Sequence, residues 1–183
     1  MMPQSFRLSF LTAMLAFPGL ASAADFELRS DDVAEGQPLD LRHVFRGFGC
    51  EGENLSPQLS WSGAPAKTKS FVVTVYDPDA PTGSGWWHWT AFDLPARTRS
   101  LPRGARAHGG LPKSAKEARN DYGAVGFGGA CPPPGEVHRY VFTVYALDVP
   151  ELSVPEGASN ALIGFMTRAH ALATARITAI YTR

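Results

Sequence analysis

The most constraining feature of the sequence is a pair of runs in which β-branched and aromatic residues follow one another without glycine or proline. Residues 70–76 read Ser-Phe-Val-Val-Thr-Val-Tyr, and residues 139–147 read Arg-Tyr-Val-Phe-Thr-Val-Tyr-Ala-Leu. Such runs are typical of strands buried on at least one face. The 18 Gly and 15 Pro among 183 residues indicate many turns and leave little room for long helices. We therefore expect an all-β domain.

Shorter patterns complete this expectation. Residues 89–94, which are followed by Pro95, and residues 176–182 have the composition of two further strands. One helix is predicted between the second long run and the last strand, because Ser159 can cap it. Apolar residues recur there at helical spacing, namely Leu162, Ile163, Met166, Ala169, Leu172 and Ala173. No repeat or linker divides the chain after residue 23, so residues 24–183 are expected to form one domain.

The first 23 residues have the pattern of a secretory signal. Arg7 precedes an apolar stretch over residues 8–17, and Ala21-Ser-Ala23 forms a small-residue cleavage site. A membrane anchor is the weaker interpretation, since the stretch is shorter than the roughly 20 residues that span a bilayer. We expect an exported protein, periplasmic or secreted. The 17 basic and 17 acidic residues exclude a nucleic-acid binder held by bulk charge.

Export affects how the two cysteines are interpreted. In an oxidising compartment Cys50 and Cys131 can form only one intramolecular disulfide. Two buried free thiols are the alternative. A metal site is disfavoured, because neither cysteine has a second Cys or His at the short spacing typical of zinc sites.

Polar and aromatic residues that can carry chemistry are concentrated in two segments. Asp77-Pro-Asp-Ala-Pro81 places two carboxylates at the end of a buried strand and is followed by Trp86-Trp-His-Trp89. The second segment, residues 126–135, is rich in Gly and Pro and leads to His138 at the start of the other long strand. Its glycines can leave backbone N–H groups free to bind an anion. If the two strands are neighbours, one pocket receives Asp77, Asp79, His88, His138 and Tyr140.

Such a pocket can bind a metal, act by general acid–base chemistry or hold a small anion. The sequence has no Gly-x-Ser-x-Gly nucleophile elbow, no phosphate-binding P-loop and no His-Glu-x-x-His metal motif. We therefore favour binding over catalysis, and expect no cofactor.

One connection is strongly basic. Residues 97–119 contain seven Lys and Arg residues against one acid, Glu117. A solvated basic loop and a contact surface for an anionic partner are equally good interpretations of this composition.

At these motifs the sequence resembles the phosphatidylethanolamine-binding proteins, a family that includes the Raf kinase inhibitor proteins. The motif at 77–81, His88 after a Trp, and the Gly-x-x-His-Arg-Tyr ending at Tyr140 are similar to the family's two signature regions. Residues 52–61 extend the likeness, and residues 83–89 resemble its bacterial branch. The resemblance implies a Greek-key sandwich of two antiparallel sheets, with a C-terminal helix, small peripheral helices and an anion pocket at one end.

Carried over to this sequence, the resemblance assigns roles to individual residues. Asp77 and His88 would face the ligand, with His138 and Tyr140 on the opposite wall. Pro81 and Pro132 would shape the rim, and Trp86 would flank it. Asp79 and Arg139 also match, although an ion pair is their more usual role. The resemblance places Cys50 and Cys131 near this pocket, which favours a disulfide between them.

We thus expect an exported protein that binds phosphate or a phospholipid headgroup without turning it over. The repulsion between an anion and Asp77 is relieved if Asp77 accepts a hydrogen bond from an imidazole and raises its pKa, so that the site is cationic below about pH 7. The alternatives are an inhibitor of a kinase or peptidase that acts through the basic loop, and a metal-dependent hydrolase.

Overall fold

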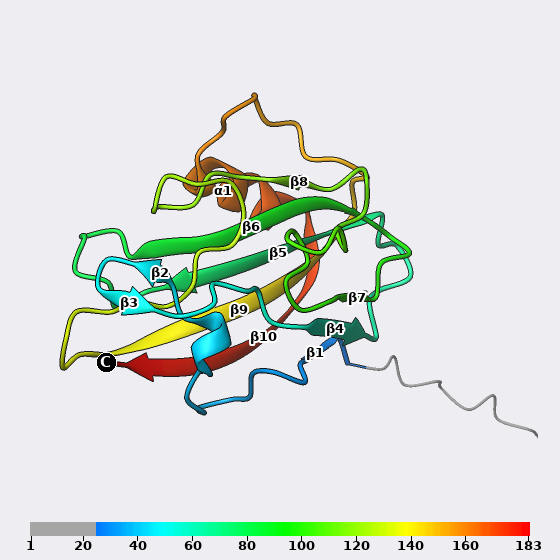
Figure 1. Ribbon diagram of the computed structural model, residues 1–183. Helices are drawn as coiled ribbons and strands as arrows, with labels where there is room; N and C mark the ends of the chain where they lie inside the picture. The colour runs from blue at the N-terminus through cyan, green and yellow to red at the C-terminus, as the bar shows by residue number, and fades with distance from the viewer. Residues whose placement is uncertain (1–24) are drawn as a thin grey trace, which may run out of the picture.

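The structure, a computed structural model, describes residues 25–183 (Figure 1). The predicted signal segment, residues 1–23, lies outside the described residues. The described chain forms an antiparallel β-sandwich with one α-helix, which confirms the expected fold class.

The larger sheet contains both long runs of the sequence. It has five strands in the spatial order β10-β9-β5-β6-β8. Their bounds are β5 Ser70–Asp77, β6 Trp86–Pro95, β8 Lys116–Glu117, β9 Val137–Leu147 and β10 Ala171–Thr182. β5 pairs with β9 along its length, so the two runs are neighbours, as a shared pocket requires. The order of β9, β5, β6 and β8 is that of a Greek key, in which the last strand returns beside the first.

The smaller sheet covers one face of the larger one. It consists of β1 Glu27–Arg29, β4 Leu59–Ser62 and β7 Ser100–Leu101, in the order β1-β4-β7. Phe71, Val73 and Val75 of β5 face it and belong to the main core. Val72 points the other way, into a second cluster beneath the helix. This alternation is why the run at 70–76 is apolar at nearly every position: both of its faces are buried.

The helix α1, Asn160–His170, packs on that second face. The Ser159 side chain caps it as predicted, by accepting a hydrogen bond from the Leu162 N–H. The helix ends earlier than the sequence indicated, because Leu172 and Ala173 belong to β10. Ala173 pairs with Ala146 of β9, and a register shift falls at Leu172. The unpaired edge of β9 provides backbone hydrogen bonds that outweigh the helical spacing of two apolar residues.

A small hairpin closes one end of the sandwich. It comprises β2 Arg46–Gly47 and β3 Cys50–Glu51 and follows a single 3-10 turn, η1 Leu41–His43. A disulfide joins Cys50 to Cys131, with an S–S distance of 2.08 Å, so the alternative of two free thiols is wrong. Arg183 connects the same two segments, since it donates to the carbonyl oxygen of Pro132 at 2.6 Å and to that of Phe48 at 3.2 Å.

Candidate functional site

A cavity of about 240 Å³ lies at this end of the sandwich, between the β2–β3 turn and the strand ends of the large sheet. Seven of the nine residues predicted for the site line it, namely Asp77, Pro81, Trp86, His88, Pro132, His138 and Tyr140. Phe48, Ala80, Thr82, Tyr122, Cys131 and Pro133 complete the lining. His88 and His138 thus line the same cavity, as the prediction of one shared pocket required.

Strand alternation places the polar residues of the cavity. Asp77 lies two residues beyond Val75 on the inner face of β5, and His138 and Tyr140 lie on the same face of β9 as Phe142. All three polar side chains are almost fully buried. The cavity therefore continues the core along β5 and β9, with polar groups in place of the apolar ones.

His88 reaches the cavity through an irregularity in β6. Tyr76 is opposite Trp87 and Val75 is opposite Trp89, so His88 is an extra residue between two paired positions. An extra residue of this kind is a β-bulge, which reorients side chains relative to simple alternation. The ring is then fixed by its Nδ1 atom, 2.7 Å from the carbonyl oxygen of Gly128.

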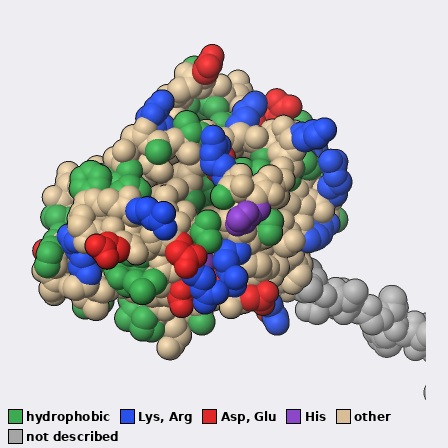
Figure 2. Space-filling model, in the orientation of Figure 1, with side chains coloured by type: hydrophobic (Ala, Val, Ile, Leu, Met, Phe, Trp, Pro, Cys, Tyr) green, Lys and Arg blue, Asp and Glu red, His purple; other side chains and the backbone are tan. Residues whose placement is uncertain are grey.

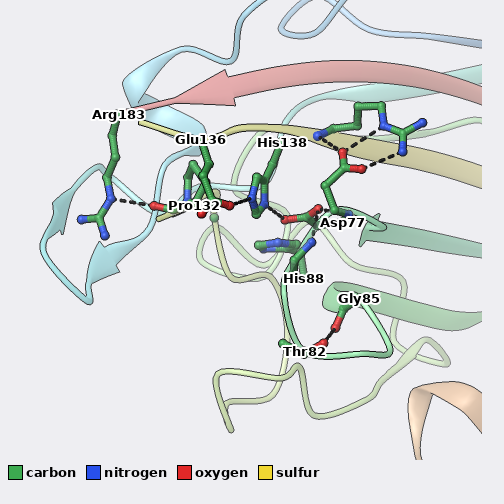
Figure 3. Close-up of polar contacts among 12 residues, drawn as sticks. Asp77, Thr82, Gly85, His88, Pro132, Glu136, His138 and Arg183 are labelled. Atoms are coloured by element: carbon green, nitrogen blue, oxygen red, sulfur yellow. Dashed lines mark hydrogen bonds and ion pairs between the residues drawn. The ribbon is translucent and has the colours of Figure 1, made fainter. Parts of the chain in front are cut away.

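Asp77 is compensated by three hydrogen bonds. Its Oδ1 accepts from the backbone N–H groups of Asp79, at 2.8 Å, and Ala80, at 3.1 Å. Its Oδ2 lies 2.7 Å from Nδ1 of His138, and the other ring nitrogen of His138 lies 3.0 Å from Glu136 (Figure 3). The expected contact between Asp77 and an imidazole is therefore present. It involves His138, with a second carboxylate on the far side of the ring.

These two carboxylates determine the charge of His138. Burial acts to lower the pKa of His138, but the hydrogen bonds to Glu136 and Asp77, with their negative charges, outweigh it and raise the pKa above its usual value. The imidazolium form satisfies both partners, because each ring nitrogen then donates to a carboxylate oxygen. The cation therefore stands against two carboxylates, which leaves the three groups with a net charge of −1, and both of its N–H groups are engaged.

His88 is the opposite case. It is 2% exposed, and this burial lowers its pKa to about 4, against the smaller opposing effects of the Gly128 carbonyl and the charge of Asp77. His88 is therefore neutral at pH 7. His88 and His138, which the sequence alone does not distinguish, therefore differ in charge: His88 is neutral, whereas His138 is favoured as the cation.

Three buried polar atoms around the cavity have no hydrogen-bond partner within residues 25–183. They are Nε2 of His88, the hydroxyl oxygen of Tyr140 and Nε1 of Trp86. Burial, with the charge of Asp77, raises the pKa of Tyr140, which keeps its hydroxyl protonated. Because buried polar atoms are nearly always paired, these three give the cavity groups that can form hydrogen bonds with a polar molecule.

Two predicted residues lie outside the cavity. The carboxylate of Asp79 pairs with the guanidinium of Arg139, at 2.9 Å from Nε and 2.6 Å from Nη2, and also accepts from the backbone N–H of Arg139 at 2.8 Å. This ion pair joins the Asp-Pro-Asp turn to β9 and is the structural role expected as the more usual one for these two residues.

The sequence predicted that glycines in residues 126–135 leave backbone N–H groups free to bind an anion. This prediction is wrong for Gly128 and Gly129, whose N–H groups both have partners within the protein. The N–H of Gly128 donates to the His88 carbonyl at 2.8 Å, and that of Gly129 donates to the side chain of Asn54 at 2.7 Å. A Cβ atom at Gly128 would lie 2.5 Å from the Tyr122 ring. These glycines permit close packing rather than anion binding.

Tyr122 and Phe48 are the largest lining residues that sequence reasoning missed. Tyr122 stacks on Phe45 with ring centroids 3.8 Å apart and contacts the rings of Phe48, Trp86 and His88. Phe48 lies in the β2–β3 turn and is 72% exposed. Neither residue follows a predicted strand. The one sequence feature that could have pointed to Phe48 is the nearby Cys50, which was expected to lie close to the pocket.

The basic segment at 97–119 contains β7 and β8, and three of its seven basic residues form ion pairs. Arg103 pairs with Asp32, Arg106 with Glu117, and Lys116 with Asp93. Figure 2 shows acidic side chains standing among Lys and Arg on the viewed face. Pairing reduces the charge that this segment can offer to an anionic partner.

Two observations bear on metal and membrane binding by the described residues. Across residues 25–183, no three His, Cys, Asp or Glu side chains are grouped as a metal site requires. None of the helices formed by these residues has the length and apolar character that a membrane crossing demands.

The fold and the cavity together define a β-sandwich protein with a small, partly polar pocket at the ends of its central strands. Comparison with known proteins gives its family. The family model for "Phosphatidylethanolamine-binding protein" matches residues 29–182. The UPF0098 protein YbhB of Escherichia coli is 53% identical over 157 residues, which cover 85% of this chain and 99% of that protein.

Solved structures agree with this match. The crystal structure of E. coli YbcL, described as a new member of the mammalian PEBP family, superposes with a TM-score of 0.84 at 53% identity, covering 87% of this chain and 99% of that one. A PEBP homologue from Chlamydia trachomatis gives a TM-score of 0.73 at 31% identity, over 87% of this chain and 98% of that one. The chain belongs to the phosphatidylethanolamine-binding protein family.

Proposed function

We propose that this protein binds a small oxyanion, such as phosphate or a phosphorylated headgroup, in the cavity between Asp77, His88 and Tyr140. The proposal rests on three polar atoms at this cavity that have no hydrogen-bond partner among residues 25–183, namely Nε2 of His88, the Tyr140 hydroxyl oxygen and Nε1 of Trp86. The Tyr140 hydroxyl and the Trp86 indole N–H can donate to anion oxygens. The negative charge of Asp77 is already met by two backbone N–H groups and the His138 ring.

The size of the cavity supports a headgroup rather than a whole lipid. Its volume of about 240 Å³ is below the roughly 300–1,000 Å³ typical of pockets for drug-sized ligands. Phe48, Pro81 and Pro133 give the rim an apolar character. An attached apolar group can therefore rest on the rim while the oxyanion enters.

Binding without turnover is part of the proposal. Cys131 is held in a disulfide, and the Thr82 hydroxyl donates to the Gly85 carbonyl at 2.5 Å. Both ring nitrogens of His138 are paired with carboxylates. These lining side chains therefore do not form the nucleophile and general-base pair on which covalent catalysis relies.

Calorimetric titration with inorganic phosphate tests the proposal, with Tyr140→Phe as the variant. This change keeps the buried ring and removes only the hydroxyl, so phosphate affinity should fall by about tenfold or more, the usual loss for a hydrogen bond to a charged group. Tyr145→Phe is the matched control, because Tyr145 lies on the same strand and packs in the cluster beneath α1. Absence of phosphate binding, or equal binding by both variants, would refute the proposal.

We further propose that the protein acts after export. The signal-like pattern of residues 1–23 and the disulfide between Cys50 and Cys131 support this, because such bonds persist in oxidising compartments. Intact-mass analysis of the protein purified from its host should give a chain that begins at Ala24. A chain that retains residues 1–23 would contradict the proposal.

A further inference from the structure

The orientation of His88 determines what its ring can offer to a ligand. A carbonyl oxygen can only accept a hydrogen bond, so the contact of 2.7 Å with Gly128 places a proton on Nδ1. The Gly128 N–H donates in turn to the His88 carbonyl at 2.8 Å, which fixes the two residues against each other. In the neutral ring the remaining nitrogen, Nε2, then carries a lone pair and is an acceptor.

The surroundings keep the ring neutral. His88 is 2% exposed, and no carboxylate among the described residues forms a hydrogen bond with it. Burial outweighs the groups that favour protonation, which are the carbonyls of Gly128 and Gly129 and the charges of Asp77 and Asp121; the two carboxylates act without a direct hydrogen bond. The other titratable groups of the cavity are the neutral hydroxyls of Tyr122 and Tyr140 and the His138 ring, which is paired with Asp77 and Glu136.

The cavity therefore combines two donors with one acceptor. The Tyr140 hydroxyl and the Trp86 N–H can donate, whereas Nε2 of His88 can only accept, and all three lack partners within the part of the chain that the structure describes. Asp77 and His138 do not change this balance, because their polar atoms are engaged with each other, with backbone N–H groups and with Glu136.

We propose that His88 is a specificity-determining residue that selects an oxyanion which still carries a proton, such as a hydrogen phosphate or a phosphomonoester monoanion, over a fully deprotonated one such as sulfate. This inference rests on the proposed anion binding and adds the protonation state of the ligand. A P–OH group can donate to Nε2 while the remaining oxygens accept from Tyr140 and Trp86. Sulfate can only turn an oxygen lone pair toward the lone pair of Nε2, which leaves a buried acceptor unpaired.

The experiment compares methyl phosphate with methyl sulfate at about pH 5.5. At this pH methyl phosphate is mainly a monoanion with one proton, because its second pKa is about 6, and methyl sulfate is a monoanion with none. The two esters thus match in shape and charge and differ in a single donor. Methyl phosphate should bind roughly tenfold to a hundredfold more tightly, the usual effect of leaving a buried acceptor unpaired. Its affinity should fall as the pH rises through about 6 and the proton is lost.

His88→Gln tests the residue itself. The amide of glutamine can turn its NH₂ group toward the ligand, so this variant should bind methyl sulfate more tightly than the wild type and should lose most of the preference. His170→Gln is the matched control, because His170 lies at the end of α1 and pairs with Asp148. Nitrogen-15 NMR gives a second readout that does not depend on the variant: in the wild type, Nε2 of His88 should show the shift of a lone-pair nitrogen and should move when methyl phosphate is added.

The outcomes separate this inference from the proposed function. Equal affinity for the two esters in the wild type, with Tyr140→Phe weakening both, would leave anion binding intact and overturn the role of His88. An NMR shift that shows a proton on Nε2 at neutral pH would overturn that role as well. If neither ester nor inorganic phosphate binds, both the inference and the proposed function are wrong.

Discussion

Removing the disulfide should destabilise the protein without dismantling the cavity. Cys50 and Cys131 are separated by 81 residues. In the chain-entropy model, a closed loop of this size stabilises the folded state by about 4.5 kcal/mol at 25 °C, because the cross-link restricts the unfolded chain. We therefore expect the double variant Cys50→Ala/Cys131→Ala to lose free energy of unfolding on this scale. Alanine is preferred to serine because it introduces no hydroxyl at the buried position 50.

Urea unfolding followed by tryptophan fluorescence measures the loss, since Trp86, Trp87 and Trp89 all lie in β6. With a slope of about 2 kcal/mol per molar urea, the midpoint should fall by roughly 2 M. The cavity should remain in the folded variant, because Arg183 still donates to Pro132 on one wall and to Phe48 on the other. Phosphate affinity should therefore stay close to that of the oxidised protein.

Two results would refute this reasoning. A fall in midpoint of less than about 0.5 M would mean that the unfolded chain gains little freedom when the bond is removed. A loss of phosphate affinity without a loss of stability would mean that the bond shapes the native cavity and that Arg183 does not hold the two walls. Wild-type protein in reductant is the control, and it should behave like the double variant.

Two further changes test the charges around the cavity. Glu136→Gln removes one of the two carboxylates that raise the pKa of His138, so an NMR titration should give this ring a lower pKa. In the wild type, the stability that protonated His138 contributes is complete below its unfolded pKa of about 6.5 and is lost as the pH rises through the higher folded pKa. The Glu136→Gln variant should lose this stability at a lower pH than the wild type. An unchanged His138 titration would contradict the assigned role of Glu136. Asp79→Asn breaks the ion pair with Arg139 outside the cavity, so phosphate affinity should be unchanged in calorimetry, and a clear loss would place Asp79 in the site after all.

The sheet could be predicted because its sequence signal is local. The runs at 70–76 and 139–147 contain enough consecutive β-branched and aromatic residues to define strands, and the motif at 77–81 ends the first of them where a polar residue continues the inner face. These features account for Asp77, His138 and Tyr140 at one cavity, whereas Pro81, Trp86 and Pro132 were predicted from the family resemblance alone. The ion pair of Asp79 and Arg139 followed from the usual behaviour of such residues at facing strand ends.

The rest depends on contacts between distant segments. The bulge at His88 exists because β6 pairs with β5 out of simple register, and no residue type in 86–89 marks it. Gly128 and Gly129 read as anion-binding glycines in the sequence, whereas close approach of Tyr122 and of the backbone at 43–45 is what requires them. Leu172 and Ala173 have helical spacing, but they belong to β10, which pairs with the otherwise free edge of β9.

The bond between Cys50 and Cys131 also governs what happens if the backbone is cut. The exposed turn at Lys113 lies between the two cysteines in the sequence. A protease that cleaves there produces two fragments, yet each retains one half-cystine, so they stay covalently joined. Both fragments also contribute strands to the five-stranded sheet. The protein can therefore survive a nick in this segment as one particle, and only a reductant together with a denaturant would separate the pieces.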